Sequence, residues 1–275
     1  AVINNNRIKN EMLKEAYAKS LIQTSADIPK TNLFSEWGQI NSPLFDYKFS
    51  INQTIQFPTV YKKQKEVLTA EYGSAILNKQ LKIYELKKAV KQCYYVHQSL
   101  KAKENLLLKA DSLYTLFYNK ALLRLQKGES NVLEKATAEN QKASIQLQLN
   151  QIHQEIESNL LLFQYLINNN NCIPQYENNL NKIKAVIDTS NFKNHPLLQL
   201  LNQQIVIEQR KTDLEKAKLN PDINFGVNAT TFSGSAADNN IYTTANRFAS
   251  VQIGVGIPIF TQSQKAKIKS SKTAQ

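Results

Sequence analysis

The chain has 275 residues, a formal net charge of +12, and only 7 glycines and 7 prolines. Such sparse helix breakers among abundant Leu, Lys, Gln, Glu and Ala predict long helices. The charge does not favour nucleic-acid binding, because the excess is almost all lysine spread along helical stretches. Cys93 and Cys172 form no C-x-x-C motif, and no stretch reaches the ~18 apolar residues of a membrane helix.

The first predicted elements are a helix over about residues 5–25, a ragged strand over about 31–38 and a turn at residues 41–43. A clean strand follows over about 47–57, where apolar and polar residues alternate strictly. Pro58 then suits the first turn of a helix, where its missing N–H has no partner to lose. The same strand–proline–helix junction returns 200 residues later, with Pro258 in the place of Pro58. We therefore interpret the chain as an internal repeat whose second copy is cut short.

A very long helix is predicted over residues 59–127, where Gly73 is the one glycine and no proline occurs. At ~1.5 Å per residue it would be about 100 Å long, so it must pack against other long helices. A heptad pattern predicts its buried seam. The seam runs through Leu86, Ala89, Cys93, Val96, Leu100, Lys103, Leu107, Ala110, Tyr114, Phe117 and Ala121.

The long helix is predicted to end in a tight tip formed by Lys127, Gly128, Glu129 and Ser130. Gly128 can adopt a left-handed backbone, and Ser130 is a candidate cap for a second helix over residues 131–167. Together the two helices form an antiparallel hairpin, which completes repeat 1 (about 5–167). A linker over 168–195, partly helical between 175 and 194, leads to repeat 2 (about 196–275).

Repeat 2 begins with a helix from Pro196 to about residue 219, and then contains strands over about 222–231 and 247–257 joined by a polar loop. Residues 261–275 predict the first turns of another helix. Strands of about 10 residues with one apolar and one polar face are typical of a transmembrane barrel, although a soluble sheet packed on helices is the alternative. The expected lipid-facing positions are Phe49, Ile51, Ile55, Phe57, Ile223, Phe225, Val227, Val251, Ile253, Val255 and Ile257.

No motif predicts an enzyme, a cofactor or a metal site. The sequence has no Gly-rich phosphate loop, no G-x-S-x-G and no H-E-x-x-H. Cys93 and His97 have the i, i+4 spacing of a metal-binding pair, but Cys93 is a seam position, which favours packing. The carboxylates of the long helices alternate with lysines, as on solvated helix faces.

Five segments resemble the TolC family of outer-membrane efflux proteins, and more closely the TolC-like domains of heavy-metal (Cus/Czc-type) resistance-nodulation-division (RND) systems. They are WGQINS (37–42), FSINQTIQFP (49–58), KGE (127–129), KLNPD (218–222) and GVGIPIF (254–260). The resemblance spans nearly all of residues 1–275 as a single TolC-like domain. It implies a mainly α fold with two β-hairpins, which in a homotrimer builds a 12-stranded barrel continued by an α-helical tunnel.

The resemblance also implies partners and a location. It predicts the outer membrane and periplasm of a Gram-negative bacterium, with the tip at Gly128 docking a periplasmic adaptor. An inner-membrane RND pump, either separate or fused in the same polypeptide, would supply the energy. The expected function is a passive exit duct for solutes, heavy-metal ions among them, that contacts the lipid bilayer and no nucleic acid. The alternative is a soluble periplasmic coiled-coil adaptor or interaction protein.

Overall fold

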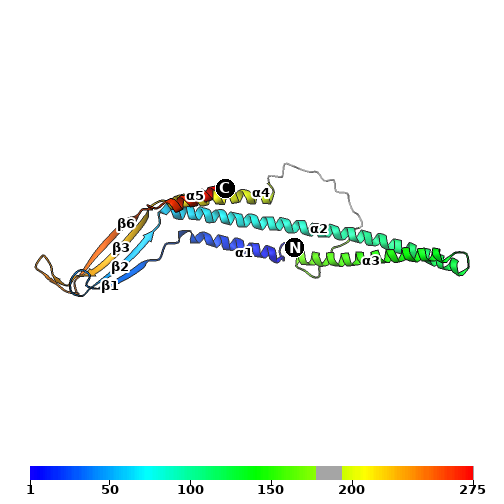
Figure 1. Ribbon diagram of the computed structural model, residues 1–275, viewed down its shortest axis with the longest axis horizontal. Coiled ribbons are helices and arrows are strands. Elements are labelled where there is room, and N and C mark those ends of the chain that lie inside the picture. Colours follow the sequence, from blue (N-terminus) through cyan, green and yellow to red (C-terminus); the bar gives the residue numbers. More distant parts are fainter. Residues whose placement is uncertain (178–193, 275) are drawn as a thin grey trace. The chain divides into compact units, whose positions relative to one another are not determined.

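The computed structural model describes residues 1–177 and 194–274. Its contacts divide the chain into unit 1, formed by Ala1–Leu13 with Asn78–Pro196, and unit 2, formed by Lys14–Leu77 with Leu197–Gln275. The chain is mainly helical with a small antiparallel sheet, which confirms the predicted fold class (Figure 1). The helices are α1 (Asn6–Leu21), a short 3-10 helix η1 (Ile22–Ala26), α2 (Pro58–Gln126), α3 (Val132–Ile167), α4 (Pro196–Ala217) and α5 (Gln262–Thr273).

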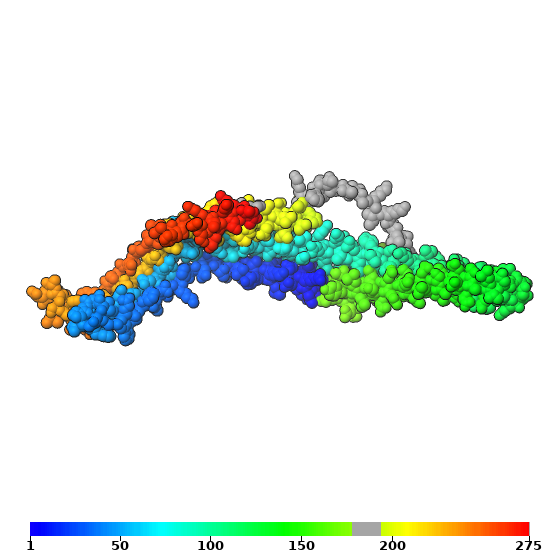
Figure 2. Space-filling view, in the orientation of Figure 1, coloured from blue at the N-terminus to red at the C-terminus, as the bar shows by residue number. Residues whose placement is uncertain are grey.

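Unit 2 contains a four-stranded sheet in the order β1-β2-β3-β6, in which every neighbouring pair is antiparallel. The strands are β1 (Asn32–Gly38), β2 (Asp46–Ile55), β3 (Asp222–Thr231) and β6 (Arg247–Gly256). The predicted β-hairpins of the two repeats therefore join edge to edge, through pairing of β2 with β3. No helix covers the strands in the space-filling view (Figure 2).

Two predicted strands end earlier than expected. They were predicted over 47–57 and 247–257, whereas β2 ends at Ile55 and β6 at Gly256. Phe57 leaves the sheet because its carbonyl accepts the N–H of Val60 at 2.8 Å, which starts α2. A further difference is a small hairpin, β4 (Gly234–Ser235) with β5 (Ile241–Tyr242), inside the loop predicted to be irregular.

Three helical segments pack together at one end of the sheet. In unit 2, α4 and α5 lie beside the first turns of α2 (Figure 1). Val60, Val67 and Leu214 form a small buried cluster between α2 and α4. Gly73 allows a close approach of α4, because a Cβ there would lie 3.0 Å from Nε2 of Gln203. A glycine inside a long helix costs about 1 kcal/mol, and this contact gives its presence a packing reason.

Unit 1 contains the helical hairpin. Cys93 Sγ in α2 donates to the carbonyl of Asn159 in α3 at 3.4 Å, and further along Glu104 Oε1 lies 3.1 Å from His153 Nε2. The sequence separation of the paired residues becomes smaller toward the tip, as expected for two antiparallel helices. The buried side chains of the hairpin include Leu86, Cys93, Leu100 and Ala121 in α2, and Ala138, Leu149, Ile156 and Phe163 in α3.

The buried seam of α2 differs from the heptad prediction at three positions. Val96, Lys103 and Phe117 were expected in the seam but are exposed, Val96 at 49% and Phe117 at 46%, whereas His97 is only 3% exposed. An α-helix has 3.6 residues per turn and drifts from a strict 3.5-residue repeat. After Cys93 the next buried residue is therefore His97, four positions on, and not Val96, three positions on. The prediction that Cys93 packs in the helix interface agrees with its burial, and burial raises the pKa of its thiol.

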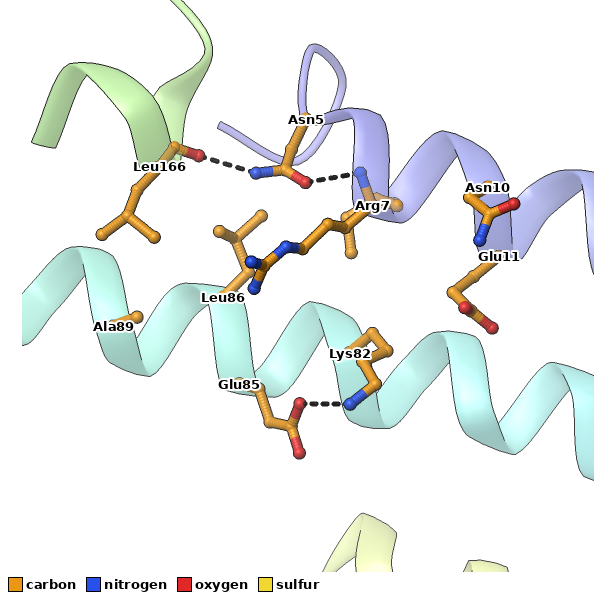
Figure 3. Close-up of a pocket in the computed structure, with 10 residues that line it drawn as sticks. Asn5, Arg7, Asn10, Glu11, Lys82, Glu85, Leu86, Ala89 and Leu166 are labelled. Carbon is orange, nitrogen blue, oxygen red and sulfur yellow. Dashed lines mark hydrogen bonds and ion pairs between the residues drawn. The ribbon is translucent and has the colours of Figure 1, made fainter. Parts of the chain in front are cut away.

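Within unit 1 the start of α1 meets the end of α3. The side chain of Asn5 donates to the carbonyl of Leu166 at 2.8 Å, and that of Asn168 donates to the carbonyl of Asn4 at 3.0 Å. Beside this junction is a cavity of ≈300 Å³, into which the side chain of Arg7 points (Figure 3). The Leu166 carbonyl is one that the end of α3 leaves unpaired, and at the start of α1 the side-chain oxygen of Asn5 accepts the N–H of Arg7 at 2.9 Å. Asn5 therefore satisfies a backbone group at each of the two helix ends. Most of the stretch predicted to be partly helical, residues 175–194, lies outside the described residues.

Candidate membrane face and hairpin tip

The sheet in unit 2 places all its odd-numbered strand residues on one face. Ile51 lies opposite Val227, which lies opposite Val251, and Phe225 lies opposite Ile253. On β1, Leu33 and Trp37 continue the same face next to Ile51 and Tyr47. The apolar positions predicted from alternation thus form one continuous surface, which we call the apolar face. It consists of Leu33, Trp37, Tyr47, Phe49, Ile51, Ile55, Ile223, Phe225, Val227, Ala249, Val251, Ile253 and Val255.

In the two central strands the apolar face is the more exposed side of the sheet. Ile51 is 50% exposed and Val227 is 51% exposed, whereas Ser50 and Asp46 on the polar face are buried. On the edge strands β1 and β6 both faces are exposed. A sheet in water buries its apolar face and exposes its polar one, because the hydrophobic effect drives the apolar side chains together. This sheet has the opposite arrangement, and so large an apolar surface marks a contact with a partner or a membrane.

The polar face is held by hydrogen bonds between its own side chains. Thr54 Oγ1 donates to Asn224 Oδ1 at 2.6 Å across β2 and β3. Asp46 accepts from the Ser42 hydroxyl at 2.8 Å and from the N–H of Asn41 at 3.2 Å. Gly226 leaves room for the Asn52 side chain, since a Cβ there would lie 2.6 Å from Asn52 Oδ1. The polar face therefore has a defined hydrogen-bonded lining, suited to contact with water.

Aromatic side chains mark the end of the apolar face that is farther from the helices. Trp37 lies directly opposite Tyr47, and Tyr47 packs edge-on against Phe49 with ring centroids 6.0 Å apart. From Tyr47 to Ile55 the strand rises about 26 Å at ~3.3 Å per residue. Outer-membrane strands carry an apolar band about 25 Å tall with aromatic residues at its borders. At the strand tilt of about 35–45° found in such barrels, this length would span roughly 20 Å of that band, and the aromatic residues at its border match the band in type.

The two predicted strand-to-helix junctions lie at the same end of the sheet but differ in form. Pro58 is the first residue of α2, as expected. Pro258 lies between β6 and α5, which begins only at Gln262, so it does not occupy the first helical turn. The segment between them carries Ile259 and Phe260, and the latter is 96% exposed.

At the hairpin tip in unit 1, Gly128 has φ +73°, the left-handed conformation predicted for it. The prediction of Ser130 as the helix cap was wrong: Asn131 caps α3, its side chain accepting the N–H of Glu134 at 3.0 Å. Ser130 instead donates its hydroxyl to the Glu134 carboxylate. That carboxylate also pairs with Arg124 at 2.6 Å, which ties the end of α2 to the start of α3.

Sequence reasoning did not find the residues that hold the tip and the border of the apolar face. Glu134 stands three residues after Asn131, and this spacing is the sequence signal of a capping arrangement. Trp37 and Tyr47 carried an interface signal in their residue type, but their pairing depends on register. The spacing of Asn131 and Glu134 identifies a cap only when the first residue of α3 is known. The aromatic pair identifies a border only when the register of β1 and β2 is known.

No three His, Cys, Asp or Glu side chains within residues 1–177 and 194–274 are grouped so that they could hold a metal ion. His97 is buried and its Nδ1 has no hydrogen-bond partner in the described part of the chain.

None of the helices that the structure describes combines the length and apolar character needed to cross a membrane.

Solved structures with the same fold are outer-membrane channels. Crystal structures of CusC, described in connection with transmembrane channel formation, match with a TM-score of 0.76 and 17% identity, over 99% of this chain and 67% of that one. The outer-membrane channel OprN matches with a TM-score of 0.78 and 14% identity, over 99% and 66%. The Campylobacter jejuni CmeC outer membrane channel matches with a TM-score of 0.75 and 15% identity, over 98% and 62%.

The comparisons by sequence give no match, either to a family model or to a curated protein. At these identities the structural likeness shows the fold, and the chain spans about two thirds of the length of the channels it matches. The chain therefore has the fold of a large part of a TolC-like channel subunit, and the neighbours that share this fold are channels and not enzymes.

Proposed function

We propose that this chain forms part of the wall of an outer-membrane efflux channel, a passive duct through which a pump expels solutes. One observation carries the proposal: in the two central strands, β2 and β3, the more exposed face of the sheet is apolar and the more buried face is polar. Exposing apolar side chains costs free energy in water but not in the hydrocarbon of a bilayer, so a bilayer suits this apolar face. The shared fold with outer-membrane channels supports the same assignment.

The proposed channel is a homotrimer. Each chain supplies four strands, so three copies would supply the twelve strands of a closed barrel with its polar face toward water. Closure would also pair the free edges of β1 and β6, which a single chain leaves open. The lipid-facing positions in this proposal are those on the apolar face, with Phe57 and Ile257 just beyond the strands.

The helices belong, in this proposal, to the periplasmic part of the duct. The tip formed by Lys127, Gly128, Glu129 and Ser130 would dock a periplasmic adaptor, which connects the duct to an inner-membrane RND pump. No bond is made or broken in the duct, so the proposed role is transport without catalysis. The location is accordingly the outer membrane and periplasm of a Gram-negative bacterium.

Heavy-metal ions are proposed as the exported solute on the strength of the sequence resemblance alone. The test is growth of a host that lacks its own channel, on graded copper, silver and zinc salts and on organic dyes. Protection against the metal salts alone supports this part of the proposal. Protection against the dyes and not the metals contradicts the metal assignment and leaves the duct intact.

The membrane assignment is tested by substitution on the two faces of the sheet. We expect Ile51→Asp with Ile253→Asp to abolish recovery of the protein in the outer-membrane fraction, because a charge at mid-band costs several kcal/mol in lipid. The matched control is Ser250→Asp with Gln252→Asp, which places the same charges on the polar face and should leave recovery unchanged. Equal recovery of both variants contradicts the lipid-facing assignment.

A further inference from the structure

Five lysines lie in unit 2 just beyond the helix end of the sheet. Two are in the first turns of α2 and three in α5, and all five side chains are exposed. We call this set the lysine collar: Lys62, Lys65, Lys265, Lys267 and Lys269. The two groups occupy equivalent places in the two repeats, each within about 10 Å of the start of its helix at 1.5 Å per residue. A repeated position for the cations suggests a common partner.

The collar lysines form no ion pairs of their own with the acidic groups around them, although Lys62 and Lys267 lie close enough to Glu66 and Glu215 to contribute to the lowered pKa of those carboxyls. Neighbouring cations are paired, since Glu66 binds Lys63 at 2.9 Å and Arg210 at 3.1 Å, and Glu215 binds Lys218 at 2.6 Å. In contrast, no collar lysine forms an ion pair within 4.0 Å anywhere in residues 1–177 and 194–274. The α5 segment contains four lysines and no Asp or Glu at all.

Lysine is in local excess at the collar, as it also is over residues 79–91 of α2, where five lysines accompany the single acidic residue Glu85. In α3, by comparison, Glu134, Glu139, Glu155 and Glu157 outnumber the two lysines, Lys135 and Lys142. The excess positive charge of the chain is thus not distributed evenly. An even distribution would indicate only a solvated surface, whereas a local excess attracts an anionic partner.

The collar lies where a membrane surface meets the apolar face. Lys62 follows Ile55, the last residue of β2, by seven residues, and Lys265 follows Gly256, the last residue of β6, by nine. The intervening Phe260 is almost fully exposed, as expected of an aromatic anchor in the interface. The headgroup layer adds about 5–7 Å on each side of the hydrocarbon, and long lysine side chains can reach it from below.

The α2–α4 groove next to the collar offers both charge and apolar surface. It has a volume of ≈610 Å³ and is lined by Lys62 and Lys65, by the ion pair of Glu66 with Arg210, and by apolar side chains that include Ala70 and Val206. Ammonium groups act as point charges that bind phosphate without demanding planar geometry, unlike the bidentate contacts of arginine to bases. The combination suits a phosphate carried on an apolar molecule, which is the chemistry of a phospholipid.

We propose that the lysine collar binds the phosphate headgroups of anionic phospholipids at the membrane surface next to the sheet. This inference rests on the proposed membrane function, and it adds a lipid preference that the apolar face alone does not provide. Each lysine near an anionic surface contributes about 1 kcal/mol, or ~fivefold in partitioning. Replacing all five lysines should therefore lower binding to anionic vesicles by about 10³–10⁴-fold.

The test is flotation of the full 275-residue chain with vesicles of phosphatidylcholine alone and with added phosphatidylglycerol. The variant replaces the five collar lysines with Gln. The matched control replaces five exposed lysines of the hairpin, Lys87, Lys88, Lys91, Lys109 and Lys120, so that both variants lose the same charge. We expect the collar variant alone to lose its preference for phosphatidylglycerol, while circular dichroism and binding to phosphatidylcholine stay unchanged.

Three results would overturn the inference. The first is equal binding of the unmodified chain to both vesicle types, and the second is an equal loss for the collar and control variants. The third is a collar variant that loses binding to a duplex DNA fragment while its vesicle binding is unchanged, which would make nucleic acid the partner. Failure of the proposed function looks different: the chain would then not bind phosphatidylcholine vesicles, or Ile51→Asp with Ile253→Asp would not reduce that binding.

Discussion

The sheet of unit 2 and the helical hairpin of unit 1 differ in which side chains they bury. In the hairpin, a core of apolar residues such as Phe163 is buried between the helices, although others such as Leu113 are exposed. In the central strands of the sheet, apolar residues such as Val227 are exposed, while polar residues such as Ser50 are buried. The hairpin thus has an apolar core between its helices, whereas the proposed channel would place the apolar face of the sheet in an apolar solvent. Alternation along a strand does not distinguish the two cases, but the side that is exposed does.

The largest expected effect breaks the hairpin core. Phe163→Ala removes a large buried side chain and should lower the free energy of unfolding by about 3–5 kcal/mol, because the cavity is only partly refilled. Leu162→Ala, at an exposed neighbouring position, is the control and should cost less than about 1 kcal/mol. Denaturant unfolding followed by far-ultraviolet circular dichroism measures both. Similar losses for the two variants would mean that the α2–α3 interface is wrongly placed.

The next effect tests the sheet. Val227→Arg on the apolar face should destabilise the lipid-inserted protein by about 2–4 kcal/mol, since arginine at mid-band is costly in lipid. In a water-exposed sheet the same change would be nearly neutral, within about 0.5 kcal/mol. Urea unfolding in phospholipid vesicles separates these outcomes, with Asn228→Arg on the polar face as the control. If Val227→Arg left the stability in vesicles unchanged, the apolar face of the sheet would not be in contact with lipid.

A smaller effect is expected at the hairpin tip. Asn131→Ala removes the side chain that caps α3 and should cost about 1 kcal/mol, felt as fraying of the first turn. Hydrogen exchange should then become about fivefold faster for the amides of residues 133–135, and unchanged around Phe163. Ser130→Ala serves as the comparison, because Ser130 contacts Glu134 without capping the helix. If Ser130→Ala frays the helix more than Asn131→Ala, the cap assignment fails.

The smallest expected effect is a pH dependence of the hairpin. Burial lowers the pKa of His97, Lys101 lowers it further, and Glu104 opposes the shift. A histidine whose folded pKa is lowered contributes stability above its unfolded pKa of about 6.5, and this is lost as the pH falls toward the folded value. The melting temperature should therefore fall between pH 7.5 and 5.5, and less so in His97→Phe. An unchanged fall in that variant would assign the pH dependence to another group.

Much of the local structure could be predicted because its signals lie close together in sequence. Strict alternation over residues 222–231 gave the bounds of β3, and Gly128 gave the left-handed turn of the tip. The cap of α3 could not be assigned, since Ser130 and Asn131 are adjacent and both residue types cap helices well. Likewise the heptad pattern located the buried seam of α2 but not its phase at Val96 and His97.

The contacts between distant segments could not be predicted from the sequence. Pairing of Ile51 with Val227 joins strands from the two repeats, and no local turn fixes that register. The apolar face as a surface, and its border at Trp37 and Tyr47, both depend on this pairing. The clustering of the lysine collar was missed for the same reason, because Lys62 and Lys265 belong to helices far apart in the chain.

The most direct measurement of the central claim is the solvent contact of each residue along β3 in vesicles. Spin labels on single cysteines at positions 223–230, in a background without Cys93 and Cys172, report collisions with oxygen in lipid and with a nickel chelate in water. The proposal predicts alternation with a period of two, with oxygen contact highest at Ile223, Phe225 and Val227 and nickel contact highest at the even positions. High nickel contact at the odd positions, or no alternation, would contradict the assignment of the apolar face to lipid.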